Sequence, residues 1–284
     1  MPELAEVKIM SEYINYVNEN ETFIGVEKSK ENKNPKIEIP YKRFRVSAKS
    51  RGKELMLIIS DTVTKESKTI LMGMGMSGNW LFIEKGPTPK HVHLIFHTDW
   101  GGRLCMVDFR RFSRWKESQT WSDNRGPCML TEWDDFVTNL ENNCDRKIFD
   151  KPIYELMLDQ KYFNGMGNYL RSEILDRANQ NPFVSSRQAI QNKPMLKLCK
   201  DIVIEAYQLG GGQLSQWTNP YFDDKQTFRQ WMQCYTKKEK IKDKNGRTFW
   251  FDSKFLTINE KNIENQEKTP KIINKNVDYL TNSI

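Results

Sequence analysis

Apolar residues recur at helical spacing at the very start of the chain. The positions, three or four apart, are Leu4, Val7, Met10, Ile14 and Val17. Such spacing is typical of the buried face of a helix, and proline and carboxylates such as Pro2, Glu3 and Glu6 are favoured in a first turn. The pattern alone leaves open whether these three residues only start a helix or also carry chemistry.

From this helix to residue 128 the apolar residues come in short runs, several of which alternate with polar residues. The runs are 43–59, 67–76, 78–84, 90–97 and 102–112. Gly, Pro and Asp separate them, as is usual between strands. The pattern predicts a domain over 1–128 that is an all-β sandwich or barrel.

Beyond residue 128 the period changes and predicts a second, helical domain over 129–228. The segments with helical spacing are 131–143, 151–163, 169–179 and 194–210. A helix over 228–235 and a hairpin over 240–255, with the turn signal Asn245-Gly246, make a third part over 229–256. The tail, 257–284, is rich in Asn, Lys and Glu and predicts little packing.

The segment 164–168, NGMGN, separates two of these helical stretches. Its glycines would leave bare N–H groups at the start of the second helix, where an anion can bind. A short turn with Asn168 at the next helix start also suits a DNA-binding helix-turn-helix variant. An ordinary helical hairpin remains the alternative.

The charge and the cysteine content of the chain limit the kinds of partner and of binding site that we expect. The chain has 44 Lys and Arg against 37 Asp and Glu, a net charge of +7, which favours a polyanionic partner. Its five cysteines form no CxxC pair, which argues against a disulfide framework or a cysteine zinc site. No signal peptide and no apolar run of about 20 residues is visible. We expect a soluble, intracellular protein.

Familiar metal and cofactor frameworks are missing. His91, His93 and His97 share one strand, but at about 3.3 Å per residue they would span roughly 20 Å, too far for a single ion. The fingerprints of P-loop, α/β-hydrolase, zinc protease and dinucleotide-binding proteins are absent from the sequence. We expect neither a metal nor a cofactor.

The remaining candidate is an amine. If Met1 is removed, Pro2 exposes a secondary amine whose pKa, near 8 for a terminal amine, lies about two units below that of lysine. Attack on an aldehyde carbon gives a Schiff base, which for a secondary amine is always a charged iminium. Glu3 and Glu6 could supply and accept protons. With the polyanion preference, this predicts a sugar aldehyde in nucleic acid as the substrate.

Several motifs, in order along the chain, resemble the formamidopyrimidine-DNA glycosylase and endonuclease VIII family. They are MPELAEV, the GK of SRGKELM, MGMSG, DFRRF and DQKYFNGMGNYLRSEIL, within residues 1–256. The pair WMQCY and KNGRTFWF resembles the eukaryotic-type endonuclease VIII-like enzymes with a zincless finger. In most of the family, four cysteines bind a zinc ion that holds this hairpin together, whereas here only Cys234 is nearby. The pairing of the hairpin strands and the aromatic residues Phe249, Trp250 and Phe251 must therefore stabilise the hairpin.

The resemblance implies an α+β multidomain fold, with a β-sandwich and leading helix followed by a helix-two-turn-helix domain that carries the hairpin, and DNA between them. It implies that Pro2 attacks C1′ of the damaged nucleotide and that Glu3 protonates the opening deoxyribose. Lys53 would contact phosphates and assist β-elimination. Arg247 would bind the phosphate beside the flipped nucleotide.

Further DNA contacts follow from the same resemblance. Asn168 and His91 would lie along the DNA backbone, and Met76, Arg110 and Phe112 would fill the gap left by the flipped base. Without the resemblance, Met76 and Phe112 would be interpreted as strand core residues and Arg110 as a surface ion-pair partner.

Two positions, Ala5 and Phe109, depart from the prolines common in the family. The lesion-capping loop, placed at 210–219, does not align, which leaves the preferred base open.

The resulting interpretation is a monomeric, bifunctional DNA glycosylase and abasic-site lyase of base excision repair. It would remove oxidised pyrimidines and hydantoins from damaged DNA, whether duplex, bubble or single-stranded, through a Pro2 Schiff base and β,δ-elimination. Two alternatives remain open at this point. One is a non-catalytic binder of DNA structures on the same fold, and the other is a helix-turn-helix regulator, which would not need a free N-terminus.

Overall fold

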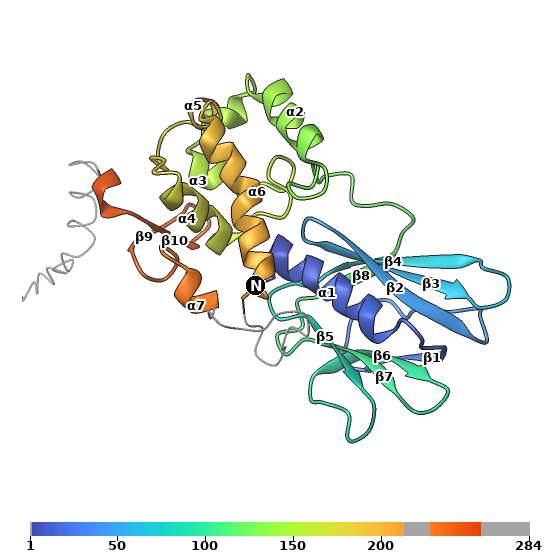
Figure 1. Ribbon diagram of the computed structural model, residues 1–284. Helices are drawn as coiled ribbons and strands as arrows, with labels where there is room; N and C mark the ends of the chain where they lie inside the picture. The colour runs from blue at the N-terminus through green and yellow to red at the C-terminus, as the bar shows by residue number, and fades with distance from the viewer. Residues whose placement is uncertain (1, 213–227, 257–284) are drawn as a thin grey trace, which may run out of the picture. The chain divides into compact units, whose positions relative to one another are not determined.

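The computed structural model describes residues 2–212 and 228–256 (Figure 1). The described residues up to Asp252 belong to one compact unit, and those from Ser253, with the short helix η2 (Ser253–Phe255), belong to a second. The first helix, α1 (Leu4–Val17), lies where the sequence predicted it. Its apolar face is buried, with Val17 at the edge. No helix in the described residues is long and apolar enough to cross a membrane.

Eight antiparallel strands follow α1 and form a folded sheet. They are β1 (Phe23–Lys28), β2 (Phe44–Arg51), β3 (Glu54–Asp61), β4 (Ser67–Gly73), β5 (Asn79–Ile83), β6 (Val92–Thr98), β7 (Arg103–Val107) and β8 (Arg114–Glu117). Their order is β5-β7-β6-β1-β2-β3-β4-β8. β1 and β2 share the single register pair Phe23↔Phe44, so the sheet folds over at this corner into the two layers of a sandwich.

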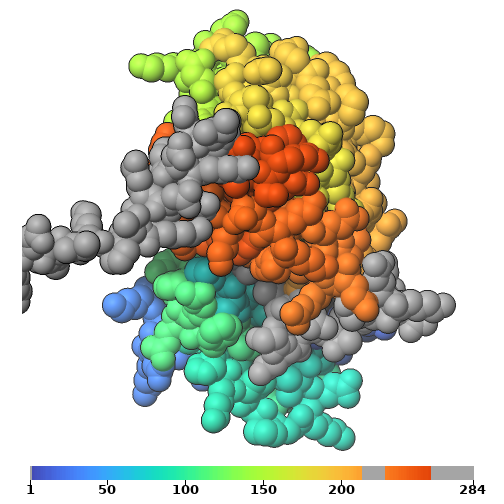
Figure 2. Space-filling model, turned by 90° about the vertical axis from the view of Figure 1, so that its left-hand side faces the viewer, coloured from blue at the N-terminus to red at the C-terminus, as the bar shows by residue number. Residues whose placement is uncertain are grey.

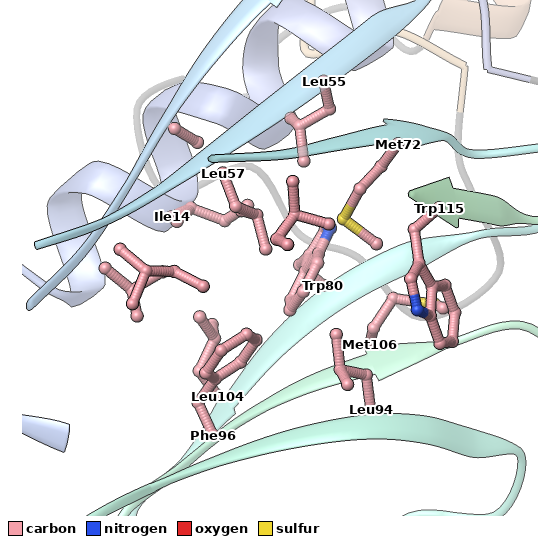
Figure 3. Packing of buried hydrophobic residues seen from close by; sticks show 14 of the residues in the cluster. Ile14, Leu55, Leu57, Met72, Trp80, Leu94, Phe96, Leu104, Met106 and Trp115 are labelled. Atoms are coloured by element: carbon pink, nitrogen blue, oxygen red, sulfur yellow. The ribbon is translucent and has the colours of Figure 1, made fainter. Parts of the chain in front are cut away.

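The core between the layers confirms the predicted sandwich (Figure 3). One layer contributes Trp80, Phe96, Leu104 and Met106, the other contributes Leu55, Leu57 and Met72, and α1 adds Ile14. Each buried side chain of this size adds about 1.5–3 kcal/mol to stability. The aromatic rings of Phe44 and Phe96 meet across the corner at 6.4 Å between centroids.

Two strands escaped the sequence pattern. β1 carries Gly25 and buries little more than Phe23, and β8 buries only Trp115 at the edge of the sheet. Neither segment shows a run of alternating apolar residues long enough to stand out.

A helical region follows the sandwich. It comprises α2 (Trp133–Asn143), η1 (Lys147–Asp150), α3 (Ile153–Leu156), α4 (Asn168–Arg177), α5 (Ser186–Ala189), α6 (Lys193–Gln208) and α7 (Phe228–Trp231). α6 packs against both α4 and α1. The hairpin of β9 (Glu239–Lys242) and β10 (Thr248–Phe251) comes next.

The predicted helix over 151–163 is wrong beyond its first turn. Only α3 is helical, and the chain from Met157 to Gly167 is irregular. The carboxylate of Asp159 accepts a hydrogen bond from the N–H of Lys161 at 3.0 Å. Such a local side-chain bond competes with the helical pattern and favours a turn.

The hairpin exists as predicted, and Asn245 and Gly246 lie in its turn, where the N–H of Gly246 donates to the carbonyl of Asp243 at 2.9 Å, but the turn is not the two-residue type that Asn-Gly favours. The last paired residues are Lys242 and Thr248, which leaves a loop over 243–247. A two-residue turn of the favoured type needs left-handed backbone at both central positions, and here only Gly246 has it, with φ of 72°. The carboxylate of Asp243 accepts N–H groups within the loop and so stabilises a wider connection.

Candidate active site

Glu3 lies at the junction of two helices. It is the residue before α1, yet its carboxylate reaches the start of α4, where Oε1 accepts the N–H of Tyr169 at 3.0 Å and Oε2 accepts that of Leu170 at 3.2 Å. A helix N-terminus favours negative charge. The sequence predicted an anion site here, and the structure shows that these two donors hold the chain's own carboxylate rather than leaving bare groups for a phosphate.

The glycines of 164–168 are explained by this approach. The N–H of Leu4 donates to the carbonyl of Gly165 at 3.0 Å. A Cβ on Gly167 would lie 2.1 Å from Cδ of Glu3, and one on Gly165, whose φ is 106°, would lie 2.4 Å from the Leu4 side chain. Only glycine lets the two segments come this close.

The environment of Glu3 tunes its acidity. The side chain is buried, 2% exposed, and burial raises its pKa from 4.5 to about 7. The positive charge of Lys53 opposes this rise and the negative charge of Glu6 adds to it. A carboxyl group with a pKa near neutrality can both donate and accept a proton at physiological pH, as a general acid requires.

Lys53 completes the centre from the sandwich side. It follows Gly52 in the turn between β2 and β3, and its Nζ donates to the carbonyl of Met166 at 2.5 Å. Burial lowers the pKa of Lys53, and Arg125 and Arg247 lower it further, while Glu3 and Glu6 raise it. The charges of two arginines and two glutamates therefore all affect the pKa of the Lys53 amine.

Pro2 and Glu6 lie beside Glu3. Pro2 is buried. Glu6, 2% exposed, accepts hydrogen bonds from the N–H of Glu3 at 2.8 Å, the phenol of Tyr169 at 3.0 Å and the N–H of Gly212 at 2.7 Å. Both its oxygens are thus engaged in holding neighbouring segments together. Of the loop expected over 210–219, only 210–212 is described, and the rest lies outside the described residues.

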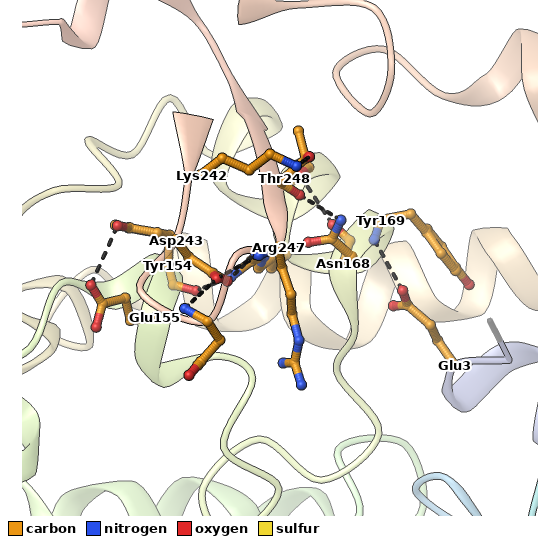
Figure 4. Close-up of polar contacts among 12 residues, drawn as sticks. Glu3, Tyr154, Glu155, Asn168, Tyr169, Lys242, Asp243, Arg247 and Thr248 are labelled. Carbon is orange, nitrogen blue, oxygen red and sulfur yellow. Dashed lines mark hydrogen bonds and ion pairs between the residues drawn. The ribbon is translucent and has the colours of Figure 1, made fainter. Parts of the chain in front are cut away.

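Arg247 is exposed in the hairpin loop (Figure 4). Asn168, expected along the DNA backbone, ties the hairpin to α4, because its amide donates to the carbonyl of Thr248 at 2.7 Å. Figure 2 shows α7 and the hairpin, in orange, on the same face of the molecule as the green and teal residues of the sandwich.

The three expected gap-filling residues lie on two neighbouring loops of the sandwich. A Cβ on Gly75, next to Met76, would lie 2.6 Å from the backbone of Phe112, so the loops touch. The guanidinium of Arg110 lies 5.2 Å from the centre of the Phe112 ring. Phe112 is 49% exposed, which excludes its interpretation as a strand core residue.

Sequence reasoning missed the residues that join these loops. The hydroxyl of Ser77 and the N–H groups of Arg110 and Ser113 all donate to the carboxylate of Asp108. Burial raises the pKa of Asp108, but these hydrogen bonds outweigh it and lower the pKa overall. The only signal was an aspartate at the end of a strand, directly before FRRF.

The three histidines lie in different surroundings and do not form one site. His91 is exposed, with a left-handed φ of 63°, and its carbonyl accepts the N–H of Asp108 at 3.0 Å. His93 is buried and bonds the carbonyl of Asp108 at 2.9 Å, whereas His97 pairs with Glu27 at 3.3 Å. Only His91 therefore lies at the surface near the gap-filling loops.

Comparison with known proteins gives matches to both ends of the chain and over most of its length. Residues 1–115 match the formamidopyrimidine-DNA glycosylase N-terminal domain, and 224–254 match the DNA-binding domain of endonuclease VIII-like 1. Human endonuclease 8-like 1 is 35% identical over 95% of this chain and 77% of its own length. Formamidopyrimidine-DNA glycosylase of Listeria monocytogenes is 30% identical over 69% of this chain and 76% of its own length.

Solved structures share the fold. A Lactococcus lactis Fpg bound to abasic-site DNA has a TM-score of 0.71 and 19% identity, covering 90% of this chain and 99% of its own. MutM (Fpg) of Thermus thermophilus has a TM-score of 0.69 and 21% identity, covering 90% and 98%. With the sequence relatives, these likenesses show that the chain belongs to the formamidopyrimidine-DNA glycosylase and endonuclease VIII family.

Proposed function

We propose that this chain, a DNA glycosylase and abasic-site lyase by its family, excises oxidised pyrimidines and hydantoins from damaged DNA through a Schiff base on Pro2. The observation that carries the proposal is the buried Glu3 carboxyl group, with a pKa of about 7, next to Pro2 and facing the charge of Lys53. The preference for these bases follows from the sequence resemblance to the eukaryotic-type endonuclease VIII-like enzymes and is decided by the experiment below.

The first half of the reaction uses the residues at the start of α1. With Met1 removed, the nitrogen of Pro2 attacks C1′, the glycosidic bond breaks as the base leaves with the bonding electrons, and the proton lost from the Pro2 nitrogen passes to the departing base. Glu3 in its acid form donates a proton to the ring oxygen of the deoxyribose, so that the sugar opens to an iminium. Burial favours that protonated form of Glu3.

The second half uses the cations. The iminium withdraws electrons from C2′, which loses a proton, and the 3′ phosphate leaves by β-elimination. The lowered pKa of Lys53 gives it a larger fraction of neutral amine to take up a proton. Arg247, with a fork suited to bidentate phosphate binding, stabilises the departing phosphate. A second elimination releases the 5′ phosphate.

Borohydride trapping tests the proposal directly, because reduction of the iminium leaves a covalent protein–DNA adduct. A panel of oligonucleotides should carry an abasic site, an oxidised pyrimidine, a hydantoin or 8-oxoguanine, the last as a contrast. We expect adducts with the first three and slower trapping with 8-oxoguanine. A non-catalytic DNA binder or a helix-turn-helix regulator would give no adduct on any of them. Faster trapping on 8-oxoguanine would refute the proposed base preference while leaving the mechanism intact.

A further inference from the structure

A buried ion pair joins α4 to the hairpin loop. Nη2 of Arg171 lies 3.4 Å from Oδ2 of Asp243, and the two side chains are 0% and 3% exposed. Burial of two charges costs much of what their attraction returns, so such a pair is weak evidence for stability alone. The other contacts of Arg171 and Asp243 indicate a second role for the pair.

The guanidinium of Arg171 is fixed on all sides. Its Nε and Nη2 donate to Oδ1 of Asn168 at 2.9 and 2.6 Å, and its Nη1 donates to the carbonyl of Tyr154 at 2.9 Å. Its plane also lies 4.9 Å from the centre of the Phe249 ring, which stacks on Tyr154. With these contacts fixing the plane of the guanidinium, Nη2 also faces Asp243 in one direction.

Asp243 passes this constraint to the loop. Its Oδ1 accepts the N–H groups of Asn245 and Arg247, both at 2.9 Å, and its own N–H donates to the carbonyl of Arg247 at 2.8 Å (Figure 4). The backbone of Arg247 is thus held at both its N–H and its carbonyl by one residue. The exposed side chain of Arg247 leaves the loop from this fixed point.

We infer that Arg171 and Asp243 are positioning residues that set the direction of Arg247 for phosphate binding. The inference rests on the proposed role of Arg247. The ion pair and the contact between the guanidinium and the Phe249 ring organise the loop on the side of α4. The pair fixes a geometry where it adds little stability.

A double-mutant cycle tests the inference. Arg247→Ala and Asp243→Asn are made singly and together, and single-turnover strand cleavage is measured on abasic-site DNA. We expect each single change to slow cleavage about tenfold, and the double variant to match Arg247→Ala within about twofold, because residues that act as a unit are not additive. The dependence of DNA affinity on salt should weaken equally in both single variants, by about 0.9 in log–log slope for one lost phosphate contact.

Asp176→Asn is the matched control. Asp176 lies on α4, is 6% exposed and pairs with Lys238 at 2.6 Å, at the foot of the hairpin rather than at its tip. This substitution should lower the melting temperature but leave the cleavage rate and the salt dependence of DNA affinity unchanged. If Asp243→Asn yields no folded protein, Arg171→Lys, which keeps the charge but loses the fork, takes its place in the cycle.

The possible results distinguish the proposed phosphate-binding role of Arg247 from the positioning role of Arg171 and Asp243. Full cleavage by Arg247→Ala refutes the proposed role of Arg247 and with it the inference. A loss in Arg247→Ala but none in Asp243→Asn, or losses that multiply in the double variant, refute the positioning role alone. An equal loss of activity in Asp176→Asn would mean that any weakening of the hairpin has the same effect, and the positioning role would again be wrong.

Discussion

Glu3 combines several tasks in one carboxylate. It precedes α1, forms a reciprocal pair of capping hydrogen bonds with Glu6 and accepts two N–H groups of α4. Hydrogen bonds to the ionised form lower its pKa, yet burial outweighs them and leaves it near 7. The residue is thus held in place by the same contacts that adjust its acidity.

Blocking the Pro2 nitrogen should abolish the chemistry and spare binding. In a variant that retains an N-terminal extension, this nitrogen is an amide and cannot attack C1′. We expect no borohydride-trapped adduct, and affinity for abasic-site DNA within about twofold of the processed protein, since the phosphate contacts lie elsewhere. Mass spectrometry of the N-terminus provides the control. An adduct formed by a fully extended protein would assign the nucleophile to another amine.

Glu3 should also make stability depend on pH. Its pKa is higher in the folded chain, about 7, than the ordinary 4.5, so its contribution is fully present below pH 4.5 and is lost as the pH rises to about 7. The loss amounts to about 3 kcal/mol at 1.36 kcal/mol per pKa unit. The melting temperature of the wild type should therefore fall relative to Glu3→Gln over this range. Parallel curves for the two proteins would show that Glu3 ionises normally.

At the scale of elements, α4 brings the parts of the site together. Its first turn holds Glu3 through Tyr169 and Leu170, while Asn168 and Arg171 hold the hairpin. The glycines before it are required by the approach of the N-terminus rather than by helix geometry. A short turn of the chain therefore sets the distance between the proposed acid and the proposed phosphate-binding loop.

Gly167→Ala tests this close approach. The new Cβ would lie 2.1 Å from Cδ of Glu3, so the carboxylate must move. We expect base excision to fall at least tenfold and unfolding stability to drop by about 1–3 kcal/mol, as for other overpacked sites. Gly25→Ala in β1 is the control, because nothing lies within 4 Å of its Cβ position. Equal effects of the two substitutions would mean that the space beside Gly167 is not critical.

Local patterns predicted the elements better than their contacts. The α1 face, most strands and the hairpin follow from periodicity. The chemistry of an N-terminal amine makes Pro2 and Glu3 candidates, and their roles stay predictions. Asp243 was not singled out, because its partner Arg171 is 72 residues away and such pairs leave no periodic signal. Asp159 and Asp243 changed a predicted helix and a predicted turn through side-chain bonds that spacing does not show.

At the scale of the whole molecule, the sandwich and the helical region meet around the N-terminus as well as through the packing of α6 on α1. Leu4 bonds Gly165, Lys53 bonds Met166, and Gly52 lies so close to Asn164 that a Cβ would be 1.9 Å from its amide oxygen. These contacts surround the proposed nucleophile and acid. The proposed centre is therefore built from both regions, in a chain whose net charge of +7 favours a polyanionic partner.

Removal of metal should leave the activity unchanged. The hairpin is held by the Arg171–Asp243 pair and by the stack of Phe249 on Tyr154, at 4.7 Å between ring centroids. After prolonged chelation we expect cleavage of abasic-site DNA at the original rate and an unchanged melting temperature. Elemental analysis should find well below one zinc per chain. A stoichiometric zinc whose loss abolishes cleavage would contradict this account.

The shared first turn of α4 has a genetic consequence. Variants that keep base release but lose strand scission should be recoverable at Asp243 or Arg247, on the hairpin side, because these residues do not contact Glu3 in the described structure. Changes at Tyr169 or Leu170, whose side chains are buried at the helix start that holds Glu3 and also anchors the hairpin, should shift this helix start and impair both activities together. A screen for separation-of-function alleles should therefore return substitutions in the loop over 243–247 and none at Tyr169 or Leu170.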